Sequence, residues 1–271
     1  MIGDITIGQY YSGSSFLHRM DARMKLVLTF VLIISVFFCK SFFSLGLIVL
    51  FTIFAVILSA VPFKMIIRSL KPILIILLFT AVLNIFYTTG GRTFFQWRSL
   101  AITEKGLNTA AFMAVRIVVL VVLSSLLTYT TTPTLLTDAL ERLLSPLGIF
   151  KIKVHTLAMM MTLALRFIPT LVEEIERIMN AQKARGADME SGGIVSRAKA
   201  LVPVFVPLMV SSFRRAYELA FAMTCRGYTG GEGRTRMKQM KLRASDFVSL
   251  VIVAAVIAGI FVLNRFFKAV I

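Results

Sequence analysis

Five apolar runs, each long enough or nearly long enough to cross a bilayer, constrain this chain more than any other feature. They occupy residues 26–39, 41–61, 72–87, 107–129 and 247–263. A helix rises about 1.5 Å per residue and the hydrocarbon core is about 30 Å thick, so runs of about 17 to 25 residues can span it. The first run is short, but Lys25 and Lys40 bracket it, and their long side chains can reach the two interfaces. A single helix over 26–61 would be about 54 Å long, so we count two spans there.

The composition agrees with a membrane location. Apolar residues make up 58% of the chain and the mean hydropathy is +0.85, far above the values of soluble globular domains. The sequence therefore predicts an all-α integral membrane protein with about five transmembrane helices. A length of 271 residues also leaves room for one extra-membrane domain, but hardly for a separate enzyme domain.

The distribution of the basic residues orients the chain. A net charge of +17 would suggest nucleic acid as a partner of a soluble chain, but 17 of the 30 Lys and Arg residues lie in the stretch 130–245. Such bias marks the cytoplasmic side of a multi-pass protein, so we expect no nucleic-acid partner. The predicted organisation is a membrane region with four spans at 1–129, a cytoplasmic domain at 130–245 and a transmembrane helix at 246–271. In the cell membrane, the N-terminus would be cytoplasmic and the C-terminus outside.

The stretch 130–245 carries two long amphipathic segments. Apolar residues recur at steps of three and four from 156 to 185, and charged residues take the opposite face, which predicts one long helix. A second helix is expected from about 194 to 226. Pro169 interrupts the first helix, and Pro203 and Pro207 interrupt the second, so each helix should bend where an amide is missing.

Both predicted helices end in an Arg-Gly pair. The two ends read Ala184-Arg185-Gly186 and Cys225-Arg226-Gly227. Taken singly, each pair fits a helix C-cap, with glycine in the left-handed position and a cation near the negative end of the dipole. Taken together, two matching cations present two equivalent anchors, which suits a partner with two-fold or pseudo-two-fold symmetry. The planar guanidinium of arginine is well suited to acidic or carbonyl-rich grooves.

These motifs, in this order, resemble the transmembrane T component of energy-coupling factor (ECF) transporters, which are vitamin and trace-metal importers powered by paired ABC-type ATPases. The opening segment IGQYYSGSSFLHRMDARMKL is similar to the N-terminal signature of that family, and the two Arg-Gly ends are similar to its pair of ATPase-docking motifs. The chain departs from the family at two places. Met20-Asp21-Ala22-Arg23 stands where Leu-Asp-Pro-Arg is more frequent, and Cys225 stands where alanine is more frequent.

The resemblance implies a non-catalytic coupling subunit without cofactor or metal. Its membrane spans would hold a small substrate-binding S component, and its crossed cytoplasmic helices would insert Arg185 and Arg226 into grooves on two ATPase subunits. Closure of the ATPases would move these helices and reorient the S component. The chain contains no G-x-x-x-x-G-K-[ST] sequence, so the ATP-binding phosphate loop must come from a partner. The vitamin or metal would be bound by another polypeptide.

An intramembrane protease is one alternative. The sequence EEIER at 173–177 is similar to the glutamate-rich helix of membrane-embedded CAAX-type peptidases. Such an enzyme needs histidines downstream, whereas His18 and His155 both lie upstream. The simpler interpretation is a solvated helix face on which Glu173 and Arg177 form an i,i+4 pair.

A stand-alone secondary transporter or channel is the other alternative. It would need inverted repeats and broken spans with polar residues near the midplane, for which Asn84 and Arg116 are nearly the only candidates. Arg116 would lie inside the fourth span, where it either makes an interhelical or functional contact or reaches toward the outer interface.

Overall fold

The chain is divided into two compact units. The computed structural model describes residues 10–88, 90, 93–97, 100–150, 153–187, 193–230, 240 and 242–267. The described parts of Gly8–Ala139 and Gln239–Ile271 form the membrane unit, and those of Leu140–Lys238 form the crossed-helix unit. The domain boundaries inferred from charge, at 130 and 245, stay a prediction of where the chain enters and leaves the membrane.

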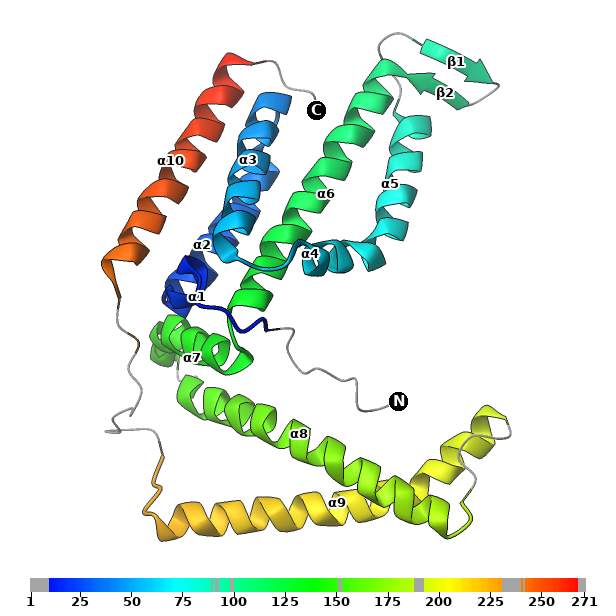
Figure 1. Ribbon diagram of the computed structural model, residues 1–271, viewed down its shortest axis with the longest axis vertical. Coiled ribbons are helices and arrows are strands. Elements are labelled where there is room, and N and C mark those ends of the chain that lie inside the picture. Colours follow the sequence, from blue (N-terminus) through cyan, green and yellow to red (C-terminus); the bar gives the residue numbers. More distant parts are fainter. Residues whose placement is uncertain are drawn as a thin grey trace. The chain divides into compact units, whose positions relative to one another are not determined.

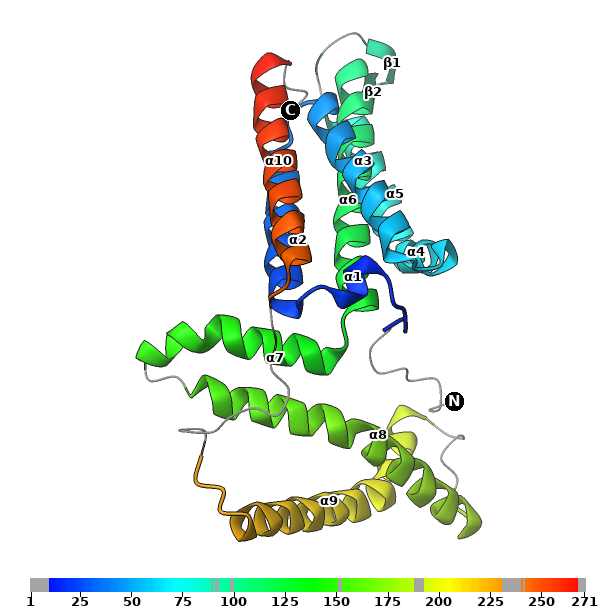
Figure 2. The same ribbon diagram turned by 60° about the vertical axis from the view of Figure 1, so that its left-hand side comes forward.

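Four long helices make the core of the membrane unit (Figures 1 and 2). They are α2 (Ala22–Phe38), α3 (Phe42–Ser59), α6 (Glu104–Thr130) and α10 (Ala244–Phe266), and the short α1 (Phe16–Arg19) precedes them. Each long helix contributes an almost fully buried side chain to one apolar cluster, namely Val36, Ile48, Phe112 and Ile260. Because lipid is as apolar as these side chains, close packing rather than exclusion of water holds the helices together.

A bent segment lies along α6. It consists of α4 (Phe63–Leu70), a single 3₁₀ turn (Lys71–Ile73) and α5 (Leu74–Tyr87), which packs against α6. A short antiparallel hairpin, β1 (Thr93–Trp97) and β2 (Leu100–Thr103), then leads into α6, with Trp97 opposite Leu100. No pattern in the sequence predicted this hairpin. Elsewhere in the described residues the regular structure is helical, and the predicted all-α membrane fold is confirmed.

The crossed-helix unit is built on two long antiparallel helices, α8 (Val154–Ala184) and α9 (Ile194–Cys225). They follow α7 (Pro133–Leu144) and a 3₁₀ segment (Ser145–Phe150). The ring Nδ1 of His155 lies 3.0 Å from Oε1 of Glu141 and ties α8 to α7. Glu174 approaches Arg215 of α9 at 3.9 Å. The predicted pair of Glu173 with Arg177 is not found among the residues that the structure describes.

Five helical stretches in the described residues are long and apolar enough to cross a membrane. They are Phe42–Ser59, Phe63–Tyr87, Glu104–Thr130, Val154–Ala184 and Ala244–Phe266. The number agrees with the predicted five, but the set differs. It includes α8, which the sequence analysis assigned to the cytoplasm, and it omits the shorter α2, whose 17 residues extend about 25 Å.

The side chains of α2 and α8 explain this difference. Helix α8 has the lowest mean hydropathy of the five stretches, 1.4 against 2.2 or more, and it carries a series of charges from Arg166 to Arg177 that a span would have to bury. Helix α2 has no charged residue beyond Lys25, and its outward-facing Phe30 and Phe37 are 62% and 60% exposed. The bilayer therefore suits α2 better than α8.

Two positions on α3 test which face of this helix packs and which meets lipid. Ile48 is fully buried, whereas Leu50 is 68% exposed. We expect Ile48→Ala to lower the stability of the protein by about 0.5–3 kcal/mol and Leu50→Ala to change it by about 0.5 kcal/mol or less. Thermal unfolding of the purified variants in one detergent measures both. Equal losses would contradict the assigned orientation of α3.

Candidate functional site

Helix α8 ends in a closed backbone turn. The N–H of Gly186 donates to the carbonyl of Lys183 at 3.0 Å, and the N–H of Ala187 donates to the carbonyl of Gln182 at 3.0 Å. Gly186 has a φ of +84°, in the left-handed region that glycine adopts without a steric penalty. These two bonds define a Schellman motif, which satisfies terminal carbonyls of the helix through the backbone alone.

Helix α9 ends in the same way. The N–H of Gly227 donates to the carbonyl of Thr224 at 2.9 Å, and the N–H of Tyr228 donates to the carbonyl of Met223 at 3.0 Å. Gly227 has a φ of +68°. The two Arg-Gly ends are therefore duplicates in geometry as well as in sequence, and the C-cap interpretation of both glycines is correct.

The arginines are not needed for this capping. Arg185 and Arg226 are the last residues before the two glycines, and both side chains are exposed. Their neighbours Ala184 and Cys225 are exposed as well. Within the described part of the chain, neither guanidinium forms a hydrogen bond or an ion pair, so the terminal carbonyls are closed without them. Each helix end thus offers a cation with all of its side-chain donors available.

The two arginines lie far from each other within the crossed-helix unit. Gln182 near the end of α8 donates to the carbonyl of Pro203 near the start of α9, at 3.3 Å, as expected for antiparallel helices. The C-terminal ends of α8 and α9 consequently point in opposite directions (Figures 1 and 2). The helical structure continues through Pro169 and through Pro203 and Pro207, and the bends at these prolines stay a prediction.

One face of α9 is apolar and uncovered. The more than half-exposed apolar side chains on this helix include Val202, Phe205, Val206, Phe213, Tyr217 and Phe221. An exposed apolar surface of this size on a soluble monomer would be unusual, and it marks a face that meets another protein or a membrane.

The N-terminal signature forms a polar cluster at the start of α2. Asp21 caps the helix by accepting a hydrogen bond from the backbone N–H of Arg23 at 2.9 Å. The Arg23 guanidinium donates to the two carboxylate oxygens of Asp21 at 3.1 and 2.9 Å. The same guanidinium donates to the carbonyl of Met240 at 3.3 Å. Burial by itself would raise the pKa of Asp21, but the hydrogen bonds and the charge of Arg23 outweigh it and hold the pKa below its ordinary value.

Comparison with known proteins decides the family. Residues 13–237 match the CbiQ family of cobalt transport proteins. A protein of Clostridium kluyveri named energy-coupling factor transporter transmembrane protein EcfT is 51% identical over 266 residues, which cover 98% of both chains. Proteins of the same name from Brevibacillus brevis and Bacillus subtilis are 48% and 46% identical over 93% and 95% of this chain. The chain belongs to the family of ECF transporter T components. The resemblance found in the sequence is confirmed, and the chain is a multi-pass membrane protein.

The structure of this T component also contains polar residues that the sequence analysis missed. Asp246 is fully buried, and its carboxylate accepts from the backbone N–H groups of Asp21 and Arg243 at 3.1 and 2.8 Å. Its only signal in the sequence is its place directly before an apolar run. The described residues contain no group of three or more His, Cys, Asp or Glu side chains that could hold a metal ion.

The pKa of Asp21 predicts how the stability of the T component depends on pH. Because the folded pKa is lowered, the stabilisation by Asp21 is present above its unfolded pKa of about 3.9 and is lost as the pH falls through the lower folded pKa. The difference in melting temperature between the wild type and Asp21→Asn should be constant near neutral pH and should shrink below about pH 4. A difference that persists unchanged in acid would mean that the carboxylate charge contributes nothing.

Proposed function

We propose that this T component couples ATP hydrolysis by two ABC-type ATPase subunits to the reorientation of a substrate-binding S component in the cell membrane. It would itself be non-catalytic and would serve the uptake of a vitamin or trace metal. The observation that carries the proposal is the pair of duplicate helix ends, each with an exposed arginine that binds no partner among the described residues. A single ordinary C-cap would need only the glycine.

The placement of the two ends favours a pair of related partners. Identical ends that point in opposite directions can each enter the same kind of groove on one member of a pair, as in a two-fold or pseudo-two-fold assembly. Arginine provides a rigid fork of donors for carboxylates or carbonyls in such a groove. A pair of ATPases meets this requirement and supplies the phosphate loop that the chain lacks.

The uncovered apolar surfaces support an additional membrane partner. The apolar face of α9 is exposed, and on α5 the side chains of Ile75 and Phe79 are 76% and 62% exposed. A partner that is itself embedded in the bilayer can cover such faces without burying polar groups. The S component is the partner with this property in the proposed assembly.

The two alternative functions gain no support from the same residues. A protease would bring a histidine to the glutamates of α8, but His155 pairs with Glu141 of α7. A stand-alone transporter would use Asn84 or Arg116 at a midplane site. Instead, Asn84 donates to the carbonyl of Thr80 in its own helix at 2.8 Å, and Arg116 donates to the carbonyl of Cys39 at 2.6 Å.

The proposed orientation places the N-terminus and the crossed-helix unit in the cytoplasm and the C-terminus outside, because the basic residues concentrate around the crossed helices. Reporter domains fused after Gly90 and at the C-terminus should both be located outside. A cytoplasmic C-terminus would imply an even number of spans and would exclude the set formed by α2, α3, α4–α5, α6 and α10.

Substitution of the two arginines tests the docking role. A buried docking contact should lose roughly 2–5 kcal/mol of association when truncated, whereas a contribution to the helix dipole amounts to about 0.3–1 kcal/mol. We expect Arg185→Ala and Arg226→Ala each to weaken co-purification of the ATPases and the double variant to abolish it. Lysine should restore binding only in part, because it lacks the planar fork.

Two other exposed arginines provide matched controls. Arg177 on α8 and Arg214 on α9 are exposed but do not end a helix. Arg177→Ala and Arg214→Ala should leave co-purification at the wild-type level, and all variants should insert into the membrane normally. Wild-type assembly of the Arg185/Arg226 double variant would refute the docking role.

A further inference from the structure

The first turn of α2 contacts the two membrane-helix ends that flank the crossed-helix unit along the chain. The chain leaves the membrane helices at the end of α6 and returns at the start of α10. Asp21, Arg23 and Lys25 bind these two places through separate hydrogen bonds. All of the residues involved belong to the membrane unit.

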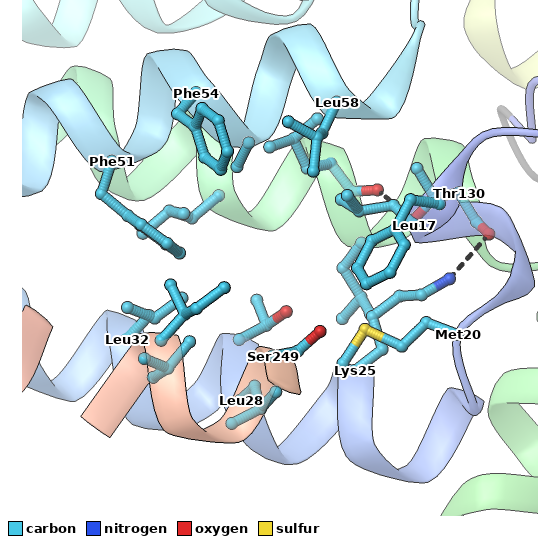
Figure 3. A pocket seen from close by; sticks show the side chains of 18 residues that line it. Leu17, Met20, Lys25, Leu28, Leu32, Phe51, Phe54, Leu58, Thr130 and Ser249 are labelled. Carbon is cyan, nitrogen blue, oxygen red and sulfur yellow. Dashed lines mark hydrogen bonds between the residues drawn. The ribbon is translucent and has the colours of Figure 1, made fainter. Parts of the chain in front are cut away.

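Lys25 holds the place where the chain leaves. Its ammonium donates to the carbonyl of Thr130, the last residue of α6, and to Oγ1 of Thr131, both at 3.0 Å. The three residues are 3–6% exposed. Figure 3 shows the Lys25 side chain reaching from α2 to Thr130. A cation at this position satisfies a terminal carbonyl and complements the negative end of the α6 dipole.

Asp21, Arg23 and Asp246 hold the place where the chain returns. Arg23 donates to the carbonyl of Met240 at 3.3 Å, in the segment that precedes α10. The two oxygens of the buried Asp246 carboxylate bind separate backbone N–H groups, those of Asp21 and Arg243. One carboxylate therefore joins the start of α2 to the start of α10.

The helix ends beside this cluster also have space in which to shift. A cavity of about 110 Å³ lies next to Lys25, lined mainly by apolar side chains of α1, α2, α3, α6 and α10 (Figure 3). Phe51, Phe54 and Leu58 of α3 form one wall, and Leu28 and Leu32 of α2 lie on the opposite side. The apolar walls of this half-open pocket do not meet across it, which leaves room for α2 and α6 to shift relative to α3.

We propose that Asp21, Arg23, Lys25 and Asp246 form a coupling junction, a set of positioning residues that makes a displacement of the crossed-helix unit move α2, α6 and α10 together. This inference rests on the proposed coupling function. Helix ends are the parts of helices that open most easily. Without hydrogen bonds from α2, a displacement of the crossed-helix unit would only fray the last turn of α6 or the first turn of α10. Because both turns are hydrogen-bonded to the start of α2, the displacement is transmitted to α2, α6 and α10 together.

The ratio of ATP hydrolysed to solute imported distinguishes this junction from a merely structural cluster. The complete complex, co-purified with its ATPase and S subunits, is reconstituted in liposomes and supplied with ATP. Radiolabelled cobalt(II) and radiolabelled B vitamins are offered one at a time. The solute that the wild-type complex accumulates is then used as the probe for all variants. We expect Lys25→Met and Asp246→Asn to keep hydrolysis but to raise this ratio by about fivefold or more, the lower end of the usual range of coupling between sites. A structural defect would reduce hydrolysis and uptake together and leave the ratio unchanged.

Two further variants keep the test decisive. Thr131→Val keeps the shape of the side chain but removes one acceptor of Lys25, and it should raise the ratio in the same direction but less. Arg19→Met removes an exposed cation of α1 at the same end of the unit and should not change it. An unchanged ratio of ATP hydrolysed to solute imported in every variant that assembles would overturn the junction. Failure of both Thr131→Val and Asp246→Asn to assemble would overturn it as well, because the contacts would then be required for folding.

The outcome for the wild type separates the junction from the proposed function. Wild-type liposomes that show no ATP-dependent uptake of any probe would overturn the proposed function, and the junction with it. ATP-dependent uptake by the wild type together with wild-type ratios in the variants would overturn the junction alone.

Discussion

A helix in a bilayer has backbone groups at both ends that the surrounding lipid cannot satisfy, and this requirement determines where the polar side chains of the membrane unit lie. Thr103 accepts from the N–H of Gly106 at the start of α6, and Lys25 binds the carbonyl at its end. Arg116 donates to the carbonyl of Cys39 at the end of α2. Arg116 therefore makes an interhelical contact, which is one of the two interpretations that the sequence left open for it.

The crossed-helix unit satisfies the same requirement in a different way. Its two long helices end in Schellman motifs, in which glycine and the backbone close the terminal carbonyls. No side chain from another helix is needed there, so Arg185 and Arg226 do not have to bind the terminal carbonyls of their own helices. In the membrane unit, by contrast, Lys25 and Arg116 donate their hydrogen bonds to the terminal carbonyls of α6 and α2. The contrast explains why cations at helix ends have different roles in the two units.

The sequence predicted the membrane helices well where composition alone decides. The runs 107–129 and 247–263 correspond to Glu104–Thr130 and Ala244–Phe266, because a span needs little more than length and apolar character. The predicted span 72–87 is shorter than the segment formed by α4 and α5, which begins at Phe63. Lys64 and Arg68 on α4 break the apolar run, and the 3₁₀ turn at Pro72 joins two helices that hydropathy separates.

The site was predictable where its contacts are local. A Schellman motif joins residues five apart, so the sequence of a helix end contains all that is needed to expect it. The contact of Asp21 with Asp246 joins residues 225 apart, and no local pattern indicates which buried polar residues meet. In the sequence, Asp21 was noted only as part of the N-terminal signature, and Asp246 was not singled out. Only the packing of α2 against α10 brings them together.

The same cluster explains why the chain can depart from its family at Ala22. Ala22 is the first residue of α2, the position at which proline fits a helix without loss because the N–H there has no partner within the helix. The hydrogen bonds of the cluster use the backbone N–H groups of Asp21 and Arg23 and the side chains around them. None of the bonds seen in the described residues uses the N–H of Ala22. Alanine and proline can therefore both occupy this position without loss of a hydrogen bond of the cluster, whereas the side chains of Asp21 and Arg23 on either side of it make those bonds.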